Sequence, residues 1–485
     1  MNYEDVMKLA LERGFYFPSC EVYADAQAGF WEYGPCGVSL KNKFLELWRR
    51  ELIRRDSMME IDGSQIMSKS VFEASGHLGN FADPIIKCTK CKSTFRADRT
   101  ILEISKIEIP ESADLEEFDN AILQNNIKCP KCKGDFENTK KFNMMFKVGI
   151  GPEEEPAYLR PETCQSIFVD FPRLFKTMRG KLPMGIAQVG KSFRNEISPR
   201  QSLLRLREFY QAEIEVFCNP TKLDEMEKFS EIADTILRIQ VDSKLQVMTC
   251  KEAVESKIIP NKFVAYYLAI LIEFYEKTGI DVTKSRFRKL GDKEKAFYAQ
   301  VAFDFEVETT IGWLELVACN YRSDYDLSSH AKKSKEKFEV MDNEEKVLPH
   351  VFEISMGIDR SLYTILEHSL YEDKENERTV LSLKPYLAPI HIGVLSLIKK
   401  DGLKEKTDEI YLQIKRKYDV FLDHSGAIGR RYRRLDEIGA PFAITVDYQT
   451  LEDQTVTLRK RDSMEQNRIK ISEIDSIISK FTAYP

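Results

Sequence analysis

Residues 190–217 read GKSFRNEISPRQSLLRLREFYQAEIEVF, and the two halves of this stretch predict a pair of strands around a basic loop. Alternate residues of a strand share one face, so Arg194 and Glu196 are expected on one side of the first strand. The corresponding face of the second strand carries Phe209, Glu213 and Glu215. Arginine can bind a phosphate through two hydrogen bonds, and an aromatic ring can stack on a base. The hairpin therefore predicts either a nucleotide-binding wall or a ladder of salt bridges.

The chain as a whole is large and carries mixed charge. Its 485 residues exceed one compact core, and this length favours about three domains. The 72 basic and 78 acidic residues give a net charge of −6, so any site for a polyanion must be local. The N-terminus has no apolar signal segment, and no apolar run approaches the roughly 18 residues of a membrane span. We therefore expect a cytoplasmic protein without a membrane partner.

Four of the ten cysteines form two CxxC pairs, one at Cys88 and Cys91 and the other at Cys129 and Cys132. Four thiolates suit tetrahedral zinc, and paired knuckles of this kind are a strong zinc signal. An amphipathic segment at 111–126 is expected to form a helix between the pairs. The alternative is two independent redox-active or incidental pairs, and a cysteine framework of disulfides is not expected in a cytoplasmic chain.

The hydrophobic pattern changes several times along the chain. Residues 40–56 place apolar side chains, including Trp48, on one helical face that fits either a domain core or a subunit interface. Residues 220–280 read as helical, whereas 301–320 alternate like strands. A strand, a glycine turn and a helix are expected at 351–368. The last hundred residues alternate strand and helix patterns, which predicts a separate α/β domain.

These segments together resemble the class II aminoacyl-tRNA synthetases. The hairpin resembles motif 2, with the sequence FRNE at 193–196 followed by Arg205, Phe209 and Glu213; GIDR at 357–360 resembles motif 3, and the helix at 40–56 takes the place of motif 1. The sequences YLRPET at 158–163 and DHSGAIGRRYRRLDEIGAPFAITVD at 423–447 narrow the resemblance to glycyl-tRNA synthetases of the dimeric archaeal/eukaryotic-like type. The resemblance covers essentially the whole chain in the family's order.

The resemblance implies an α+β fold, in which helices flank an antiparallel class II sheet. It also implies a zinc-knuckle-like insertion and a C-terminal α/β anticodon-binding domain. The implied parts are residues 1–84, the N-terminal part of the catalytic domain with motif 1; 85–140, the cysteine-rich zinc insertion; 141–218, the catalytic core with motif 2; 219–300, a helical insertion; 301–380, the core with motif 3; and 385–485, the anticodon-binding domain.

The implied activity is that of a glycine–tRNA ligase, which joins glycine to ATP and transfers it from glycyl-adenylate to the 3′ end of tRNA(Gly). Attack on the α-phosphorus needs positive charge around the phosphates more than a strong nucleophile. The residues implied to bind ATP are Arg194, Glu196, Arg205, Phe209, Glu315 and Arg360, of which Arg194 and Arg360 are the catalytic arginines. Mg²⁺ bound with ATP is expected at Glu315, with Glu308 or Asp304 as less favoured ligands.

Glycine has no side chain, so the implied pocket binds its two charged ends and leaves no space beyond Cα. The residues implied to surround it are Glu162, Glu213, Arg322, Glu353 and Ser355. Larger amino acids are excluded sterically, so no editing site is required against them. The chain departs from the family's pattern at Ser166, Tyr321 and Ile354. These differences affect the expected shape of the pocket but remove no charged group.

The implied macromolecular partners are tRNA(Gly) and a second copy of the chain, with no DNA. Arg200 in the hairpin loop is expected at the acceptor end, and Arg430 and Arg431 at a structural or tRNA-facing position. Residues 381–485 carry a small excess of basic side chains over acidic ones, unlike the rest of the chain. Basic clusters of this kind contact phosphates and make RNA affinity dependent on salt.

Two other functions stay open at the level of sequence. A catalytically inactive, synthetase-like RNA-binding accessory protein would be expected to lack Arg194, Arg360 or the glycine carboxylates, all of which are present. A class II synthetase for proline, threonine or histidine would need different pocket residues. A threonine enzyme, for example, has metal-ligating Cys and His in the pocket, whereas the CxxC pairs here lie in an insertion.

Overall fold

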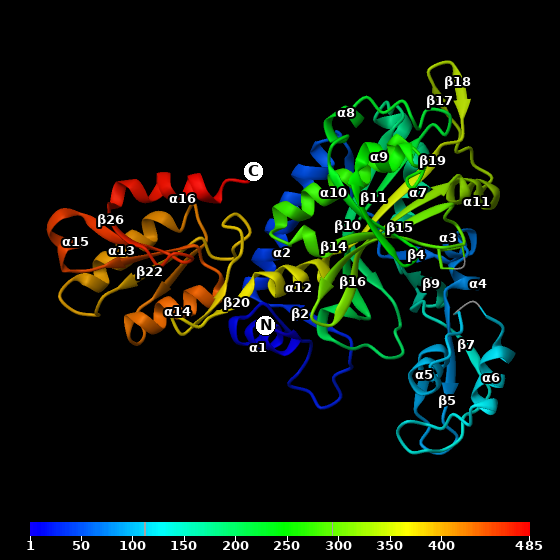
Figure 1. The fold of residues 1–485 in the computed structure, drawn as a ribbon, viewed down its shortest axis with the longest axis horizontal. Helices are drawn as coiled ribbons and strands as arrows, with labels where there is room; N and C mark the ends of the chain where they lie inside the picture. Colours follow the sequence, from blue (N-terminus) through cyan, green and yellow to red (C-terminus); the bar gives the residue numbers. More distant parts are fainter. Residues whose placement is uncertain (111–112, 293) are drawn as a thin grey trace.

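The computed structural model describes residues 1–110, 113–292 and 294–485, and it has three parts (Figure 1). A central body is built on one large sheet, an insertion projects from it, and a C-terminal domain lies on the other side of the body in this view. The mixture of helices with a mainly antiparallel sheet agrees with the expected α+β fold. Among the described helices, none is both long enough and apolar enough to cross a membrane.

The central sheet has nine strands in the order β13-β12-β14-β15-β16-β19-β11-β10-β3. Neighbouring strands are antiparallel, except that β3 runs parallel to β10 and β12 parallel to β14. In chain order the strands are β3 Met59–Ile61, β10 Met184–Phe193, β11 Glu208–Cys218, β12 Ile236–Val241, β13 Lys244–Thr249, β14 Ser285–Lys289, β15 Val301–Thr309, β16 Gly312–Ser323 and β19 His350–Gly357.

The two faces of this sheet differ in chemistry because strand residues alternate. On β11, the residues Ala212, Ile214 and Val216 join the main core beneath the helices α2, α10 and α12. The intervening residues of β11 and β19, among them Glu213 and Glu353, point to the opposite face. One face thus supplies the core, and the other is free to carry a polar site.

Helix α10 (Lys262–Thr278) shows why the core face is stable. Asn261 caps its first turn by accepting from the backbone N–H of Val264, and Gly279 ends it in the left-handed conformation. Nearly every side chain of α10 is buried, as expected for a helix that is apolar all round. Each large apolar side chain buried in this way contributes about 1.5–3 kcal/mol relative to an exposed one.

The helix predicted at 40–56 begins earlier, because α2 spans Pro35–Trp48 and continues as a π-helical segment, Arg49–Arg54. Proline is favoured in the first turn of a helix, where its missing N–H is not needed. Trp48 is completely buried within the chain, so its face belongs to the domain core and not to a subunit interface. The other helices of the body are α1 Tyr3–Arg13, α3 Lys69–Ala74, α4 His77–Asn80, α7 Cys164–Thr177, α8 Phe229–Ile232, α9 Cys250–Glu255, α11 Tyr325–Ser334 and α12 Ile358–Ser369.

The prediction that 219–300 is a helical insertion is wrong for much of this segment. Among its described residues, α8, α9, α10 and a short 3-10 turn at Val282–Lys284 are helical, while β12, β13 and β14 extend one side of the central sheet. The apolar spacing here fits two kinds of structure. Ile232 and Ile239 are seven residues apart, as on one face of a helix, whereas Leu237 and Ile239 are two apart and are the buried residues of β12. The strands expected at 301–320 and the strand–helix unit at 351–368 are confirmed as β15, β16, β19 and α12.

The insertion has its own small sheet and core. Its strands are β5 Ala82–Lys87, β6 Thr94–Arg96 and β7 Lys140–Asn143, and its helices are α5 Ala97–Ser105 and α6 Leu115–Gln124. The predicted helix at 111–126 is confirmed within α6, and residues 111–112 lie outside the described residues. The core consists of a few side chains, including Ile86, Ile101 and Phe118.

The C-terminal domain alternates strand and helix as predicted. Its five strands have the order β23-β22-β24-β25-β26. They span β22 Ile392–Ser396, β23 Val420–Asp423, β24 Phe442–Val446, β25 Thr455–Lys460 and β26 Gln466–Lys470, and the helices are α13 Leu403–Ile414, α14 Ile428–Ile438, α15 Tyr448–Asp453 and α16 Ile474–Thr482. Small sheets complete the chain: β1 Tyr16–Pro18 with β2 Trp31–Tyr33, β4 Ile66–Ser68 with β9 Glu155–Leu159 and β8 Lys147–Ile150, β17 Val340–Asp342 with β18 Glu345–Val347, and β20 Leu370–Asp373 with β21 Arg378–Leu381.

Candidate active site

The polar face of the central sheet contains a cavity of about 440 Å³. Nine of the predicted site residues line it: Glu162, Arg194, Glu196, Arg205, Phe209, Glu315, Glu353, Ser355 and Arg360. They come from β11, β16, β19, α12 and the loops around the hairpin, so distant parts of the sequence meet here. Glu213 lies next to this lining and accepts a hydrogen bond from Ser355 at 2.6 Å.

Arg194 occupies the centre of one half of the cavity. Its guanidinium lies 5.3 Å from the ring centroids of both Phe81 and Phe209, and its Nε donates to the carbonyl of Pro161 at 3.1 Å. Two aromatic rings and one hydrogen bond therefore hold this arginine in place. Phe209 was predicted as an adenine-stacking plane, and it is also a support for Arg194.

Arg194 and Glu196 do not share one face of a strand, because β10 ends at Phe193. The N–H of Arg194 still donates across the hairpin to the carbonyl of Arg207, and the chain then turns, with the N–H of Glu196 donating to the carbonyl of Arg194 at 2.6 Å. Glu196 is instead fixed by Arg205, whose Nε and Nη2 both lie 2.7 Å from one carboxylate oxygen. The salt-bridge alternative is thus correct for this pair within the hairpin.

Arg360 reaches the cavity from the first turn of α12. Its Nη1 donates to the carbonyl of Glu315 at 3.0 Å and lies 3.4 Å from the Glu315 carboxylate. About a third of the Arg360 side chain remains exposed, so it is accessible to a ligand.

The candidate magnesium ligands differ in their surroundings. Burial and the charge of Glu315 raise the pKa of Asp304 to about 7. Asp304 does not line the cavity, however, and its carboxylate is already paired with Arg288 at 3.0 Å. Glu308 is exposed near the end of β15, where its backbone carbonyl contacts His368. The arrangement therefore leaves Glu315, which lines the cavity, as the favoured magnesium ligand.

The other half of the cavity is a cluster of buried carboxylates. Glu213 is held by three donors: Thr163 and Ser355 hydroxyls at 2.6 Å each and the Gln211 amide at 3.2 Å. Burial and the charge of Glu162 nevertheless raise the pKa of the Glu213 carboxyl. These donors orient the carboxylate, while the buried position leaves it short of positive charge.

Glu353 is positioned by Arg322 and Asn320, which donate at 2.8 and 2.6 Å. Arg322 is 1% exposed, and its remaining nitrogens bind Asp326 at 2.6 and 2.8 Å. The structure therefore places Arg322 behind Glu353 and outside the residues that line the cavity, which differs from its predicted place beside the substrate carboxylate. Burial, opposed in part by Arg322 and reinforced by Glu213, raises the pKa of Glu353 to about 7.

Glu162 completes the cluster with a different charge balance. Burial opposes its ionisation, but His77 and Arg322 outweigh burial and hold the pKa of its carboxyl well below its usual range. The Nε2 of His77 lies 3.2 Å from the Glu162 carboxylate, and Gln165 donates to it at 2.9 Å. Glu162 therefore keeps its charge before any ligand binds.

Glu215 lies two residues after Glu213 on β11, on the same face of the strand, and is completely buried. Neither of its carboxylate oxygens has a hydrogen-bond partner among the described residues. Burial, followed by the charge of Glu353, raises the pKa of Glu215 well above its ordinary value. This side of the cavity is thus rich in carboxyl groups, and it can bind a small ammonium group once a proton leaves the cluster.

Sequence reasoning missed several residues that support this cluster: His77, Thr163, Gln211, Tyr298, Asn320 and Asp326. Asp326 could have been found from its position four residues after Arg322. Gln211 alternates with Phe209 and Glu213 on β11, so it also had a signal in the sequence. His77 and Tyr298 come from distant segments, and only the fold brings them to the site.

The three arginines predicted at tRNA-facing positions are not equivalent. Arg200 is exposed in the hairpin loop, with Glu103 of the insertion 3.9 Å away, and Arg430 is exposed on α14. Arg431 is only 2% exposed and donates to the carbonyls of Ser396 and Asp423. The prediction that Arg431 contacts RNA is therefore wrong, because successive residues of α14 point to different sides.

The four paired cysteines of the insertion converge. Their sulfur atoms all lie within 4.8 Å of one another, with Cys88 3.5 Å from Cys132 and Cys91 3.7 Å from Cys129. Both pairs use the same turn, since the lysine after each second cysteine has a φ of 60°. Four convergent thiols fit a tetrahedral zinc ion. The alternative of two independent pairs does not fit this geometry.

Comparisons with known proteins agree with the fold and the site. A family model described as "tRNA synthetase class II core domain (G, H, P, S and T)" matches residues 146–369, and one described as "Anticodon binding domain" matches residues 386–481. Curated proteins named glycine–tRNA ligase are similar over nearly their full length. The protein from Methanothrix thermoacetophila is 39% identical, with 98% of this chain and 96% of the relative covered. The protein from Methanocaldococcus jannaschii is 39% identical, with 97% of each covered, and that from Pyrococcus furiosus is 38% identical, with 98% of each covered.

Solved structures support the fold. A structure described as the RNA binding domain of threonyl-tRNA synthetase from Cryptosporidium parvum has a TM-score of 0.60 at 18% identity and covers 99% of this chain and 98% of that one. Prolyl-tRNA synthetase from the same organism has a TM-score of 0.56 at 14% identity and covers 98% of this chain and 75% of that one. At these identities the likeness concerns the fold alone, whereas the curated relatives carry the family. The chain belongs to the glycine–tRNA ligases, a family with a class II catalytic core and a C-terminal anticodon-binding domain.

Proposed function

We propose that this protein activates glycine with ATP to glycyl-adenylate and transfers the glycine to the 3′ end of tRNA(Gly). The observation that carries the proposal is one cavity with an arginine pair on one side and a carboxylate cluster on the other. The family relationship supports the same substrates. An inactive accessory role is disfavoured, because both arginines and the carboxylates are present and face the cavity.

In this proposal the two arginines act on the phosphates of ATP. Arg194 binds the α-phosphate and the amino-acid carboxylate, and Arg360 binds the γ-phosphate. Negative charge develops on the phosphate oxygens during in-line attack, so fixed cations near them lower the barrier. Phe209 stacks on adenine and Glu196 contacts its amino edge, while Arg205 holds Glu196 in position.

The carboxylate cluster selects glycine by charge and by size. Glu162, Glu213 and Glu353 surround the ammonium group, and Ser355 orients Glu213. Arg322 contributes indirectly, by holding Glu353. Side chains larger than hydrogen are rejected by the packed wall, which is the basis of single-step selection here.

Metals and assembly extend the proposal. Mg²⁺ would arrive with ATP and be held at Glu315, with Glu308 or Asp304 as less favoured ligands, and Zn²⁺ would be held by Cys88, Cys91, Cys129 and Cys132. The protein is a cytoplasmic homodimer, as the family resemblance implies.

The six-part division of the chain is retained, with 219–300 now a mixed strand and helix segment. Arg200 and Arg430 contact tRNA, and they are the exposed members of the predicted set.

The direct test is charging of unfractionated tRNA by the purified protein with radiolabelled glycine and ATP. We expect label in acid-precipitable tRNA that depends on both ATP and active protein. Charging with proline or threonine and not with glycine would favour the other class II alternatives, and no charging with any amino acid would favour an accessory protein.

A further inference from the structure

The hairpin β20–β21 joins the catalytic body to the C-terminal domain, and it lies between the segments matched by the two family models. It follows directly after α12, the helix that carries Arg360 in its first turn. The hairpin packs against α14 of the C-terminal domain. A single continuous segment thus leads from the phosphate-binding arginine to the domain boundary.

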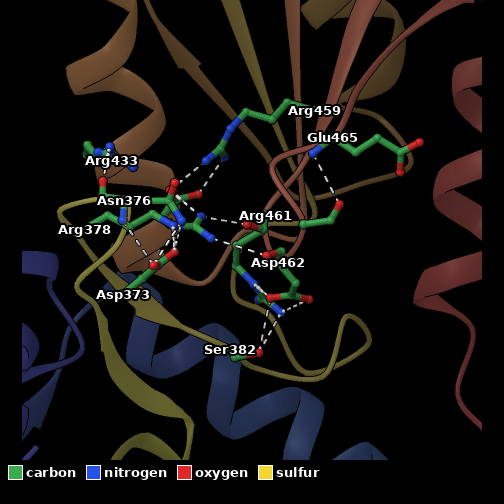
Figure 2. Close-up of polar contacts among 11 residues, drawn as sticks. Asp373, Asn376, Arg378, Ser382, Arg433, Arg459, Arg461, Asp462 and Glu465 are labelled. Atoms are coloured by element: carbon green, nitrogen blue, oxygen red, sulfur yellow. Dashed lines mark hydrogen bonds and ion pairs between the residues drawn. The ribbon is translucent and has the colours of Figure 1, made fainter.

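Arg378, the first residue of β21, makes the principal contact across this boundary. Its side chain is 1% exposed, and it binds Asp373 of its own hairpin at 2.7 Å. From there it crosses into the C-terminal domain, where it binds the carbonyls of Arg461 and Asp462 at 2.7 and 3.3 Å (Figure 2). It also binds the Asp436 carboxylate at 3.1 Å. All three guanidinium nitrogens are therefore engaged.

Contacts also run in the opposite direction. Arg461 of the C-terminal domain is 2% exposed, and it donates to the carbonyl of Leu383 in the connecting segment at 3.0 Å. Arg433 of α14 donates to the carbonyl of Asn376 at the tip of the hairpin at 2.6 Å (Figure 2). The boundary is thus fixed by interlocked arginines from both domains.

Asp436 is the shared centre of the cluster. It is completely buried, and Arg459 binds its two oxygens at 2.7 and 2.9 Å while Arg378 approaches from the other domain. Charges buried in this way are tolerated only when they are paired in good geometry, and removal of one partner is strongly unfavourable. The network therefore permits one docked arrangement of the domains and disfavours sliding between them.

Two further ion pairs anchor the same domain to the body at other points. Arg13 of α1 binds Glu437 of α14 at 2.7 Å, and Lys43 of α2 binds Asp419 at 2.8 Å. These pairs are partly exposed and contribute little individually. The buried cluster around Arg378 and Asp436 is thus the specific element of the boundary.

We infer that Arg378 and Asp436 are positioning residues for tRNA charging, which hold the anticodon-binding domain in register with the adenylate site. This inference rests on the proposed function. A tRNA must reach the C-terminal domain and the cavity at the same time, so the spacing between them sets how well its 3′ end meets the adenylate. Glycine and ATP contact the cavity alone, and their reaction is independent of that spacing.

The test compares two activities of Arg378→Lys and Asp436→Asn. Arg378→Lys keeps the charge but cannot make the forked set of contacts, since lysine is a point donor. We expect glycine-dependent pyrophosphate exchange within about twofold of the parent for both variants. Aminoacylation is expected to lose at least tenfold in kcat/KM for tRNA. Arg468→Lys is the matched control, because Arg468 pairs with Asp447 inside the C-terminal domain, and both activities should stay near those of the parent.

A second measurement is independent of the substrates. Small-angle scattering of Arg378→Lys, without ligands, should give a larger radius of gyration than the parent or the control, because the domains separate. Aminoacylation within twofold of the parent together with unchanged scattering would overturn the inference, as would an equal loss of exchange and charging. A parent that shows no glycine-dependent exchange would contradict the proposed function, whereas the scattering result would still decide the role of the cluster in docking.

Discussion

Arg194 and Arg360 approach the cavity from different elements, and each is fixed by neighbours that leave part of it free. Arg194 lies between two aromatic rings, and Arg360 is held by the backbone of Glu315. Such restraint prepares a cation for the charge that develops in a phosphoryl-transfer step. At the residue scale, we expect these side chains to matter for the reaction and not for folding.

Replacement of Arg194 by alanine tests this role. We expect glycine-dependent exchange to fall by about a hundredfold or more, the usual effect of removing one oriented donor from a transition state. The thermal unfolding temperature should change little, because Arg194 is partly exposed. Arg173→Ala, on the exposed side of α7, is the control. Exchange within tenfold of the parent would refute the assignment.

The carboxylate cluster predicts a pH dependence for glycine binding. The pKa of Glu353 is raised to about 7 by burial, so below that pH the empty site holds a proton that the glycine ammonium must displace. Binding should therefore tighten as pH rises through 7, with KM for glycine falling by at most about tenfold per pH unit for one proton. Exchange kinetics between pH 6 and 8 measure this, and a KM that stays constant or rises with pH would contradict the protonated cluster.

The same shift has a consequence for stability without ligand. A carboxyl whose pKa is raised in the folded state binds more protons there than in the unfolded chain, between its ordinary pKa and about 7. The stability of the ligand-free protein should accordingly decrease as pH rises across that window. Glu353→Gln removes the titrating group and should flatten this part of the pH profile.

At the scale of elements, the insertion depends on its cysteines. Its core contains few apolar side chains, and a small core of this kind needs an additional constraint to stay folded. The zinc ion proposed at Cys88, Cys91, Cys129 and Cys132 would supply that constraint by joining two turns of the chain. The insertion also borders the cavity through Arg99, so its order affects the site.

Cys88→Ser tests the metal site. We expect the purified variant to lose most of the one zinc per chain of the parent, measured by mass spectrometry of the metal, because a hydroxyl is a poor zinc ligand. Hydrogen exchange within 85–140 should accelerate, while exchange in α10 stays unchanged. Cys20→Ser is the control, since Cys20 is exposed and distant from the cluster in sequence. A reduced, active parent without zinc would rule the site out.

The accuracy of sequence reasoning followed the physical nature of each signal. Strict alternation on β11, β15 and β19 predicted the strands and which residues share a face. The apolar spacing around Leu237 and Ile239 fits both a helix and a strand. Only the pairing of β12 with β13 and β14 decides for a strand. The tRNA-facing position predicted for Arg431 is wrong because charge alone does not tell which side of a helix faces solvent. Arg322 lies behind Glu353 because it also binds Asp326, a partner that the motif does not include.

At the scale of the whole molecule, one buried network joins the catalytic body to the C-terminal domain. The central sheet presents the adenylate site, and the C-terminal domain carries the implied anticodon site. Family motifs in the sequence predicted both domains, but the cluster around Arg378 had no signal there, since its members are spread from 373 to 462 and meet only in the fold. Long-range pairing of this kind cannot be read from spacing.

For the whole molecule we also predict that two copies of the chain form a homodimer. The sheet ends at β3, which pairs only with β10 and so offers an edge within the described residues. Sedimentation equilibrium should give twice the mass of one chain and show dissociation only on strong dilution. A monomer mass at working concentration would contradict the assembly. A monomer would not bear on the cavity, whose proposed role in glycine activation is tested by the activity assays.

The most direct measurement of the central claim is amino-acid-dependent pyrophosphate exchange, performed in parallel with glycine, alanine, serine, proline, threonine and histidine. In the proposed function the cavity combines an arginine pair for the phosphates with a pocket for an amino acid that has no side chain, so exchange should depend on glycine and stay near background with the others. Exchange that depends on another amino acid, or none at all with a folded protein, would contradict the account.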